Sequence, residues 1–235
     1  MLTIESARSW YPASDPVHGF DHVLRVYHLA EQLAQAEGAD LEIVRAAALL
    51  HDATGDQRSV DSHGLTYAQA GGQPSEISNQ HSTINNIRLN HHHASSDFAA
   101  QVLRAEGWDE ARIAAVQHCI RAHRFRDNRE SPHTLEAKIL FDADKLDAIG
   151  AVGVARAIGY AIQAGQPAYA KPSQQFLDSG ELEPGEPHSA YHEFLFKLRH
   201  LKDRLYTPAA KSIANERHRV MAEFFERLAG EMGGK

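Results

Sequence analysis

Residues 42–56 read EIVRAAALLHDATGD, an apolar run that ends on the adjacent pair His51 and Asp52. The apolar spacing predicts a helix whose buried face finishes on an imidazole and a carboxylate. A buried carboxylate beside a histidine is costly unless a positive group neutralises it, and a divalent metal ion is such a group. The pair therefore predicts a metal site with further ligands elsewhere in the chain.

The composition is that of a globular protein. With 235 residues and 43% hydrophobic content, the chain can bury a core, and we expect one domain over residues 1–235. The net charge of -7 offers no general attraction for bulk nucleic acid or anionic membranes, so a phosphorylated ligand needs a local positive site. Self-association into a homo-oligomer is left open.

Three features bear on where the protein works. Cys119 is the one cysteine and cannot form an internal disulfide, so a buried apolar role is favoured over a reactive thiol. The N-terminus lacks a signal pattern, and no apolar run reaches the length of a membrane span. We therefore expect a cytoplasmic protein with no membrane partner.

The first half of the chain predicts two helices and a polar stretch. A helix is expected over His18–Glu37, because apolar residues recur with His22 on one face. Asp40 is expected to cap a second helix, which carries the His-Asp pair and ends by Gly55. Residues 57–93 are polar with little periodicity, which indicates a long loop or short helical pieces.

Helical periodicity resumes in the second half. Ser95 or Ser96 is expected to cap one helix, and residues 109–123 form another. The run LEAKILFDADKLDAIGAVGVARAIGYAI predicts either one long helix or two helices broken near Gly150 and Gly153.

The remainder is expected to be a loop and a helical end. Residues 165–187 are rich in proline and glycine and predict a loop, followed by two amphipathic helices within residues 188–233. No stretch shows a convincing strand pattern. The expected fold class is all-α, with long polar loops and extra C-terminal helices.

Two further metal ligands are expected on other helices. His22 lies on the inward face of the first helix, and Asp144 shares an apolar face with Leu140 and Ala148. Two imidazoles and two carboxylates suit a divalent ion such as Mn, Mg, Fe, Co, Ni or Zn, and leave positions for water and substrate. An open site of this kind is typical of catalysis, because a held ion lowers the pKa of water and neutralises phosphoryl oxygens.

Three segments occur in order: HGFDHVLRV (18–26), AALLHDATGD (47–56) and LFDADKLDAIGAVGVAR (140–156). They resemble the HD-domain superfamily of metal-dependent phosphohydrolases, and more narrowly its small stand-alone bacterial branch of nucleotide phosphatases and pyrophosphohydrolases. The resemblance implies an HD helical bundle over about residues 15–165 with a helical extension over about 188–233. It also implies one divalent ion and a small phosphorylated substrate, by preference a nucleotide.

By position, the resemblance implies metal ligation by His22, His51, Asp52 and Asp144. Asp144 is chosen because the family's ligand precedes a basic residue and a leucine. Asp142 and Asp147 remain alternatives, although each faces a different side of the helix from Asp144.

Several side chains are candidates for the chemistry itself. Arg25, one turn after the first ligand, and Lys145 would bind phosphate oxygens, with a solvated ion pair or solvated face as the alternative. His123 is a phosphate-binding or proton-donating candidate that matches a histidine of this branch. Asp52 would orient the attacking water, and Asp56 would hold or deprotonate it unless it is a plain turn residue.

The chain has sixteen histidines, most of which must be bystanders. The run His91–His93 is interpreted as an incidental surface feature, because three consecutive side chains cannot all converge on one ion. A di-iron oxygenase is a second hypothesis, which needs two more inward histidines from this run, His118 or His123. A sensing module that keeps the metal site without turnover is a third.

Overall fold

The computed structural model describes residues 2–11, 19–53, 92–124 and 130–234. All regular structure in these ranges is helical, which confirms the all-α prediction. The chain divides into two compact units, Met1–Phe141 and Asp142–Lys235. A single domain over the whole chain stays a prediction. None of the described helices combines the length and apolar character needed to cross a bilayer.

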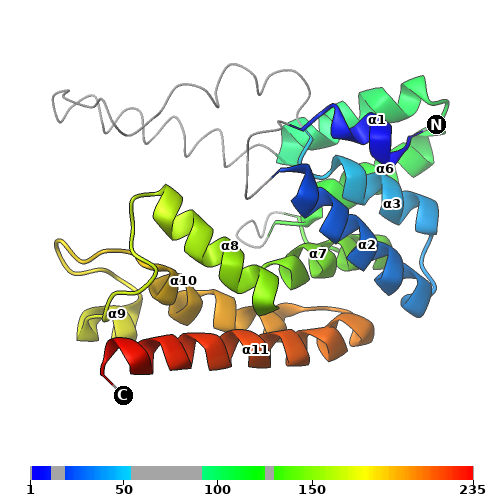
Figure 1. The fold of residues 1–235 in the computed structure, drawn as a ribbon. Coiled ribbons are helices and arrows are strands. Elements are labelled where there is room, and N and C mark those ends of the chain that lie inside the picture. The colour runs from blue at the N-terminus through cyan, green and yellow to red at the C-terminus, as the bar shows by residue number, and fades with distance from the viewer. Residues whose placement is uncertain (1, 12–18, 54–91, 125–129, 235) are drawn as a thin grey trace, which may run out of the picture. The chain divides into compact units, whose positions relative to one another are not determined.

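The first unit is organised around one central helix (Figure 1). Its labelled helices are α1 (Ile4–Arg8), α2 (Phe20–Glu37), α3 (Leu41–Leu50), α6 (Glu110–Ala122) and the first half of α7 (Leu135–Asp147), with a further helical stretch over 92–105. α3 packs against α1, α2 and α6. Its run from Ala46 to Leu50 is wholly or almost wholly buried, because neighbours cover it on several sides. The end of α3 therefore emerges inside the unit.

The ends of α2 and α3 follow local chemistry. α2 ends at Gly38, whose φ of 75° lies in the left-handed region that favours glycine. Asp40 caps α3, as predicted, because its carboxylate accepts hydrogen bonds from the N–H groups of Glu42 (2.9 Å) and Ile43 (3.2 Å). The predicted start of α2 at residue 18 lies outside the described residues, and the helix is seen from Phe20.

The predicted cap at Ser95 or Ser96 is wrong. Both serines lie within the helical stretch 92–105, and both are buried. Serine favours caps because its hydroxyl competes for nearby backbone groups. Here the Ser96 hydroxyl instead accepts a hydrogen bond from Arg121 on α6, at 3.3 Å. A tertiary contact has overridden the local preference.

The second unit holds the end of α7 and the C-terminal helices. These are α8 (Gly150–Gln163), α9 (Gln174–Ser179), α10 (Ala190–Phe196), the 3-10 helix η2 (Leu198–Arg204) and α11 (Pro208–Met232). α11 packs against α8 and η2, and α10 packs against the same two elements (Figure 1). The stretch 165–187, expected as loop, also contains the short helix α9.

The long run that starts α7 is two helices, which confirms the broken alternative. α7 ends at Asp147 and α8 begins at Gly150, whose φ of 78° suits glycine. A Cβ at Gly150 would also lie 3.0 Å from side-chain atoms of Arg217 on α11. The first predicted C-terminal helix is likewise divided, because α10 gives way to η2 at Lys197.

Candidate metal centre

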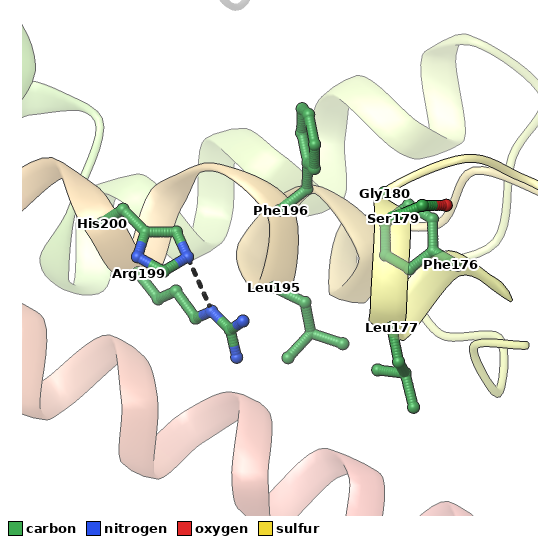
Figure 2. Close-up of a pocket in the computed structure, with 8 residues that line it drawn as sticks. All are labelled: Phe176, Leu177, Ser179, Gly180, Leu195, Phe196, Arg199 and His200. Carbon is green, nitrogen blue, oxygen red and sulfur yellow. Dashed lines mark hydrogen bonds between the residues drawn. The ribbon is translucent and has the colours of Figure 1, made fainter. Parts of the chain in front are cut away.

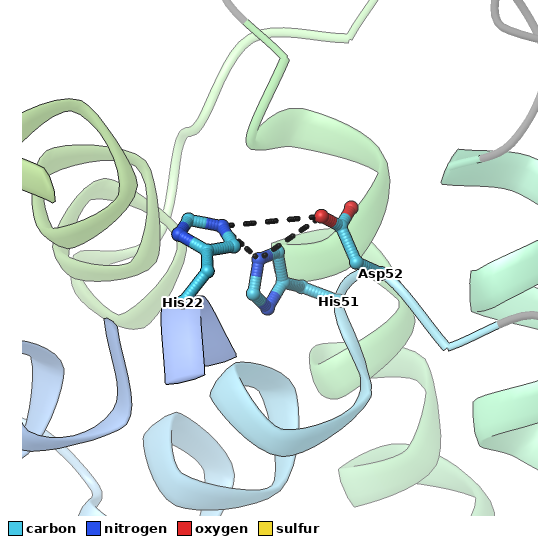
Figure 3. Close-up of side chains that lie close together, drawn as sticks. All are labelled: His22, His51 and Asp52. Atoms are coloured by element: carbon cyan, nitrogen blue, oxygen red, sulfur yellow. Dashed lines mark hydrogen bonds and ion pairs between the residues drawn. The ribbon is translucent and has the colours of Figure 1, made fainter. Parts of the chain in front are cut away.

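Three ligand atoms from the first unit converge at the end of α3 (Figure 3). His22 Nε2 lies 3.4 Å from His51 Nε2 and 3.9 Å from one oxygen of Asp52, Oδ2. His51 Nε2 lies 3.6 Å from the same oxygen. The structure therefore brings together three of the four predicted ligands, and these three residues could hold a metal ion.

The dimensions of this triangle fit a metal ion. A point equidistant from three atoms with these separations lies about 2.1 Å from each. Zinc binds histidine nitrogen and carboxylate oxygen at about 2.0 to 2.2 Å, and other first-row divalent ions accept the same donor types. Two neutral imidazoles and one carboxylate also leave coordination positions open.

The backbone at the end of α3 sets the tautomer of His51. His51 is the C-cap residue, and its Nδ1–H donates to the carbonyl of Ala48 at 2.8 Å. A histidine that donates from one ring nitrogen presents the lone pair of the other. His51 Nε2 is thereby turned toward His22 on α2 as an acceptor, which is the state that metal binding requires.

Burial differs between the imidazoles and the carboxylate. His22 is 2% exposed and His51 is fully buried, whereas the Asp52 side chain keeps 16% of its surface exposed. The two histidines are held in an apolar surround of low dielectric, where a nearby charge acts strongly. Solvent and a ligand reach the group from the side of Asp52.

His123 lies at the same group, as predicted. It is the C-cap residue of α6 and is 4% exposed. Its Nδ1–H donates to the carbonyl of Ile120 at 2.5 Å, which presents Nε2 as an acceptor 3.8 Å from Asp52 Oδ1. The two oxygens of Asp52 thus face different partners, Oδ2 toward His22 and His51 and Oδ1 toward His123.

The other predicted residues are placed less directly. Arg25 is half-buried on α2, one turn beyond His22. Asp56 lies outside the described residues. Asp144 and Lys145 lie on α7 within the second unit, where Lys145 Nζ donates to Asp144 Oδ2 at 2.6 Å. Their roles at the metal centre stay predictions.

The two alternative aspartates on α7 have other partners. Asp142 is buried and accepts hydrogen bonds from the N–H groups of Tyr206 and Thr207, each at 2.8 Å, and from the Thr207 hydroxyl. Burial raises the pKa of Asp142, although these hydrogen bonds act to lower it. Asp147 forms an ion pair with Arg156 at 2.5 Å. Asp142 and Asp147 therefore stabilise the second unit.

The interpretation of His91–His93 as a surface run is wrong for one member. His92 is 2% exposed, and its Nδ1 lies 3.3 Å from a guanidinium nitrogen of Arg124. His93 is exposed, and residue 91 lies outside the described ranges. The reason is that the helix already begins at residue 92, so its inward face includes that position.

His118 offers no ligand atom for a second ion. Its Nδ1–H donates to Glu130 at 2.6 Å, and its Nε2 accepts from the backbone N–H of His133 at 3.3 Å. Within the described ranges, His22, His51 and Asp52 form the one group of three close ligand atoms. The di-iron hypothesis therefore gains no support from His118.

A shallow pocket of about 240 Å³ opens in the second unit, between α9 and the segment formed by α10 and η2 (Figure 2). It is lined by Phe176, Leu177, Ser179, Gly180, Leu195, Phe196, Arg199 and His200. None of the predicted site residues lines it. The candidate site is therefore defined by ligand geometry and not by this pocket.

Known proteins resemble the chain over almost its full length. The Bacillus subtilis (strain 168) protein YpgQ is 32% identical over 237 residues, which cover 98% of this chain and 94% of YpgQ. A crystal structure of YpgQ in complex with ADP matches with a TM-score of 0.64 and 31% identity, over 99% of both chains. An HD-superfamily hydrolase from Bacillus thuringiensis matches with a TM-score of 0.62 and 26% identity, over 99% of this chain and 97% of that one.

The family assignment agrees with the geometry at the end of α3. The HD domain family model matches residues 19–149, more than half of the chain. This range contains His22, His51 and Asp52, whose ligand atoms converge, and it also contains His123 and Asp144. The chain belongs to the HD domain family.

Proposed function

We propose that the protein is a metal-dependent phosphohydrolase that cleaves a phosphoester or phosphoanhydride bond of a small phosphorylated metabolite, by preference a nucleotide. The observation that carries this proposal is the triangle formed by His22 Nε2, His51 Nε2 and Asp52 Oδ2, with separations of 3.4 to 3.9 Å. Structures named HD-superfamily hydrolases among its structural neighbours support the reaction class.

The proposed cofactor is one divalent ion, chosen from Mn, Mg, Fe, Co, Ni and Zn, held by His22, His51, Asp52 and Asp144. A bound ion of this kind lowers the pKa of water and offsets negative charge on a phosphoryl oxygen. His22 and His51 contribute neutral donors and Asp52 contributes a negative one, so the site keeps a net attraction for a cation.

The side chains around the ligands divide the remaining tasks. Hydrolysis forms a bond from a water oxygen to phosphorus while the bond from phosphorus to the leaving oxygen breaks, and one proton moves between these oxygens. His123 Nε2 is suited to carry that proton, because its Nδ1 is already committed to the Ile120 carbonyl. Asp52 Oδ1, 3.8 Å away, would orient the water, with Asp56 as a second candidate.

Phosphate binding is assigned to cationic side chains. Arg25 would hold phosphate oxygens bidentately, and Lys145 would act as a point charge beside Asp144. Because the chain carries a net charge of -7, such local cations are needed to bind an anion. A nucleotide is favoured as substrate because YpgQ, a relative of nearly equal extent, was crystallised with ADP.

The test is turnover by the purified protein loaded in turn with each of the six ions. Nucleoside mono-, di- and triphosphates are offered, and phosphate and pyrophosphate are measured separately. Release of either product by the wild type, but not by Asp52→Ala, is expected. His192→Leu is the matched control, because this buried histidine of the second unit is remote in sequence from the proposed ligands.

Two outcomes would replace the proposal. A protein that binds an ion and a nucleotide but releases neither product would be a sensing module. Two irons per chain with a visible chromophore in air would instead indicate a di-iron oxygenase.

A further inference from the structure

The last carbonyls of α3 accept hydrogen bonds from outside the regular helix. A helix leaves its final four carbonyls without helical partners, so other donors decide the path of the chain that follows. Here the Ala48 carbonyl accepts from the His51 ring and the Leu50 carbonyl from the Ala53 N–H. The carbonyl between them, on Leu49, accepts from the hydroxyl of Tyr11 at 2.8 Å.

Tyr11 comes from a distant part of the sequence. It follows α1 in the N-terminal segment, 38 positions before Leu49, and is 7% exposed. The hydrogen bond is buried, so its loss would leave a carbonyl unsatisfied in an apolar surround. Tyr11 therefore holds the backbone two residues before His51.

The ring of Tyr11 touches the other helix that carries a ligand. Its centroid lies 5.6 Å from that of Phe20, the first residue of α2, with the two rings tilted by 49°. Phe20 is 7% exposed and is covered on another side by the Arg8 guanidinium, 4.5 Å from its ring centroid. The start of α2 is thereby fixed two residues before His22.

We propose that Tyr11 is a positioning residue that sets the separation between His22 and His51. One side chain contacts the start of α2 through its ring and the end of α3 through its hydroxyl. Ligand constellations must be held to within about 0.5 Å, and loss of an outer-shell partner lowers metal affinity by about 10 to 100-fold. The inference rests on the metal site of the proposed function.

The test is Tyr11→Phe, which keeps the ring against Phe20 and removes the hydroxyl. Binding of Mn²⁺ is measured by titration calorimetry without substrate, and we expect about tenfold weaker binding than in the wild type. If the protein hydrolyses nucleotides, the Mn²⁺ concentration for half-maximal rate should rise, while the rate at saturating Mn²⁺ returns to the wild-type level.

Tyr27→Phe is the matched control. Tyr27 is half-buried on α2, beside Glu31 and Arg45, and this variant should bind Mn²⁺ as the wild type does. Unfolding midpoints of the metal-free proteins separate positioning from a structural role. A lowered midpoint for Tyr11→Phe with unchanged Mn²⁺ affinity would overturn the inference alone. A wild type that binds no divalent ion would overturn both this inference and the proposed function.

Discussion

Two buried groups in this chain combine histidine with a carboxylate, and their distances differ. At the end of α3, the ligand atoms of His22, His51 and Asp52 stand 3.4 to 3.9 Å apart. In the second unit, His192 Nδ1 lies 2.7 Å from the Ser189 hydroxyl and Nε2 lies 3.0 Å from Glu186. The shorter distances are those of hydrogen bonds, whereas the longer ones match atoms that share a metal ion.

The second group shows how a carboxylate is stabilised without an ion. Glu186 also accepts hydrogen bonds from the backbone N–H and hydroxyl of Ser173, at 2.6 and 2.7 Å, and from the N–H of Glu183 at 2.8 Å. Both nitrogens of the fully buried His192 are committed. The comparison therefore assigns a structural role to His192 and a metal-binding role to His51.

Removing a ligand should give the largest effect. His51→Ala and Asp52→Ala should each lower metal affinity by more than about 100-fold, which exceeds the usual cost of losing an outer-shell partner. Nucleotide turnover should be abolished with it. Metal content after dialysis and product release measure the two effects. Wild-type activity in Asp52→Ala would contradict the mechanism.

The fourth ligand can be tested by exchanging the two aspartates on α7. Asp144→Asn should lower metal affinity by at least about tenfold, because it removes a negative donor. Asp142→Asn should leave metal affinity unchanged and destabilise the protein by about 1 to 3 kcal/mol, because the Tyr206 and Thr207 N–H groups lose their charged acceptor. Calorimetry and urea unfolding distinguish the two. The reverse pattern would assign the ligand to Asp142.

The hydrogen-bonded group should respond in the opposite way from the metal centre. His192→Leu leaves the fully buried Ser189 hydroxyl without its histidine partner and should cost about 1 to 3 kcal/mol of unfolding free energy. Metal content should equal that of the wild type. A loss of bound metal in this variant, with the fold intact by circular dichroism, would refute the structural assignment.

Acid should weaken the second group gradually, which is the smallest effect expected here. Burial acts to raise the pKa of Glu186, but hydrogen bonds from His192, Ser173 and Glu183 lower it to about 2. Because this pKa lies below the ordinary value of 4.5, the carboxylate stabilises the fold above about pH 4.5, and this contribution is lost toward pH 2.

Glu186→Gln should therefore flatten the pH dependence of the unfolding free energy between pH 5 and 3, measured by urea unfolding. Glu181→Gln, an exposed glutamate of the same loop, is the control and should leave the slope as it is. Equal slopes for wild type and Glu186→Gln would contradict the assigned hydrogen bonds.

Periodicity and adjacency were sufficient to predict the core of the candidate site. His51 and Asp52 follow an apolar helix, and His22 lies on the inward face of its own helix, so both patterns are local. Tyr11 could not be found in this way, because its contact with Leu49 spans 38 positions and no motif surrounds it. The structural use of Asp142 likewise depends on residues more than 60 positions away.

The fold was predictable to a similar degree. The cap at Asp40 and the break before Gly150 depend on one residue and its neighbours, and both are seen. The buried positions of Ser96 and His92 depend on Arg121 and Arg124, which follow much later in the chain. Local patterns therefore specify the elements, whereas contacts distant in sequence decide how individual polar side chains are used.

The central claim is that an ion binds where the histidine and carboxylate atoms are too far apart for hydrogen bonds. Anomalous diffraction from crystals soaked in Mn²⁺ tests this most directly. The account predicts a peak bonded to His22 Nε2, His51 Nε2 and Asp52 Oδ2, at about 2.0 to 2.2 Å from each. A peak at His192 and Glu186 instead, or none at His51 in protein that binds Mn²⁺ in solution, would contradict it.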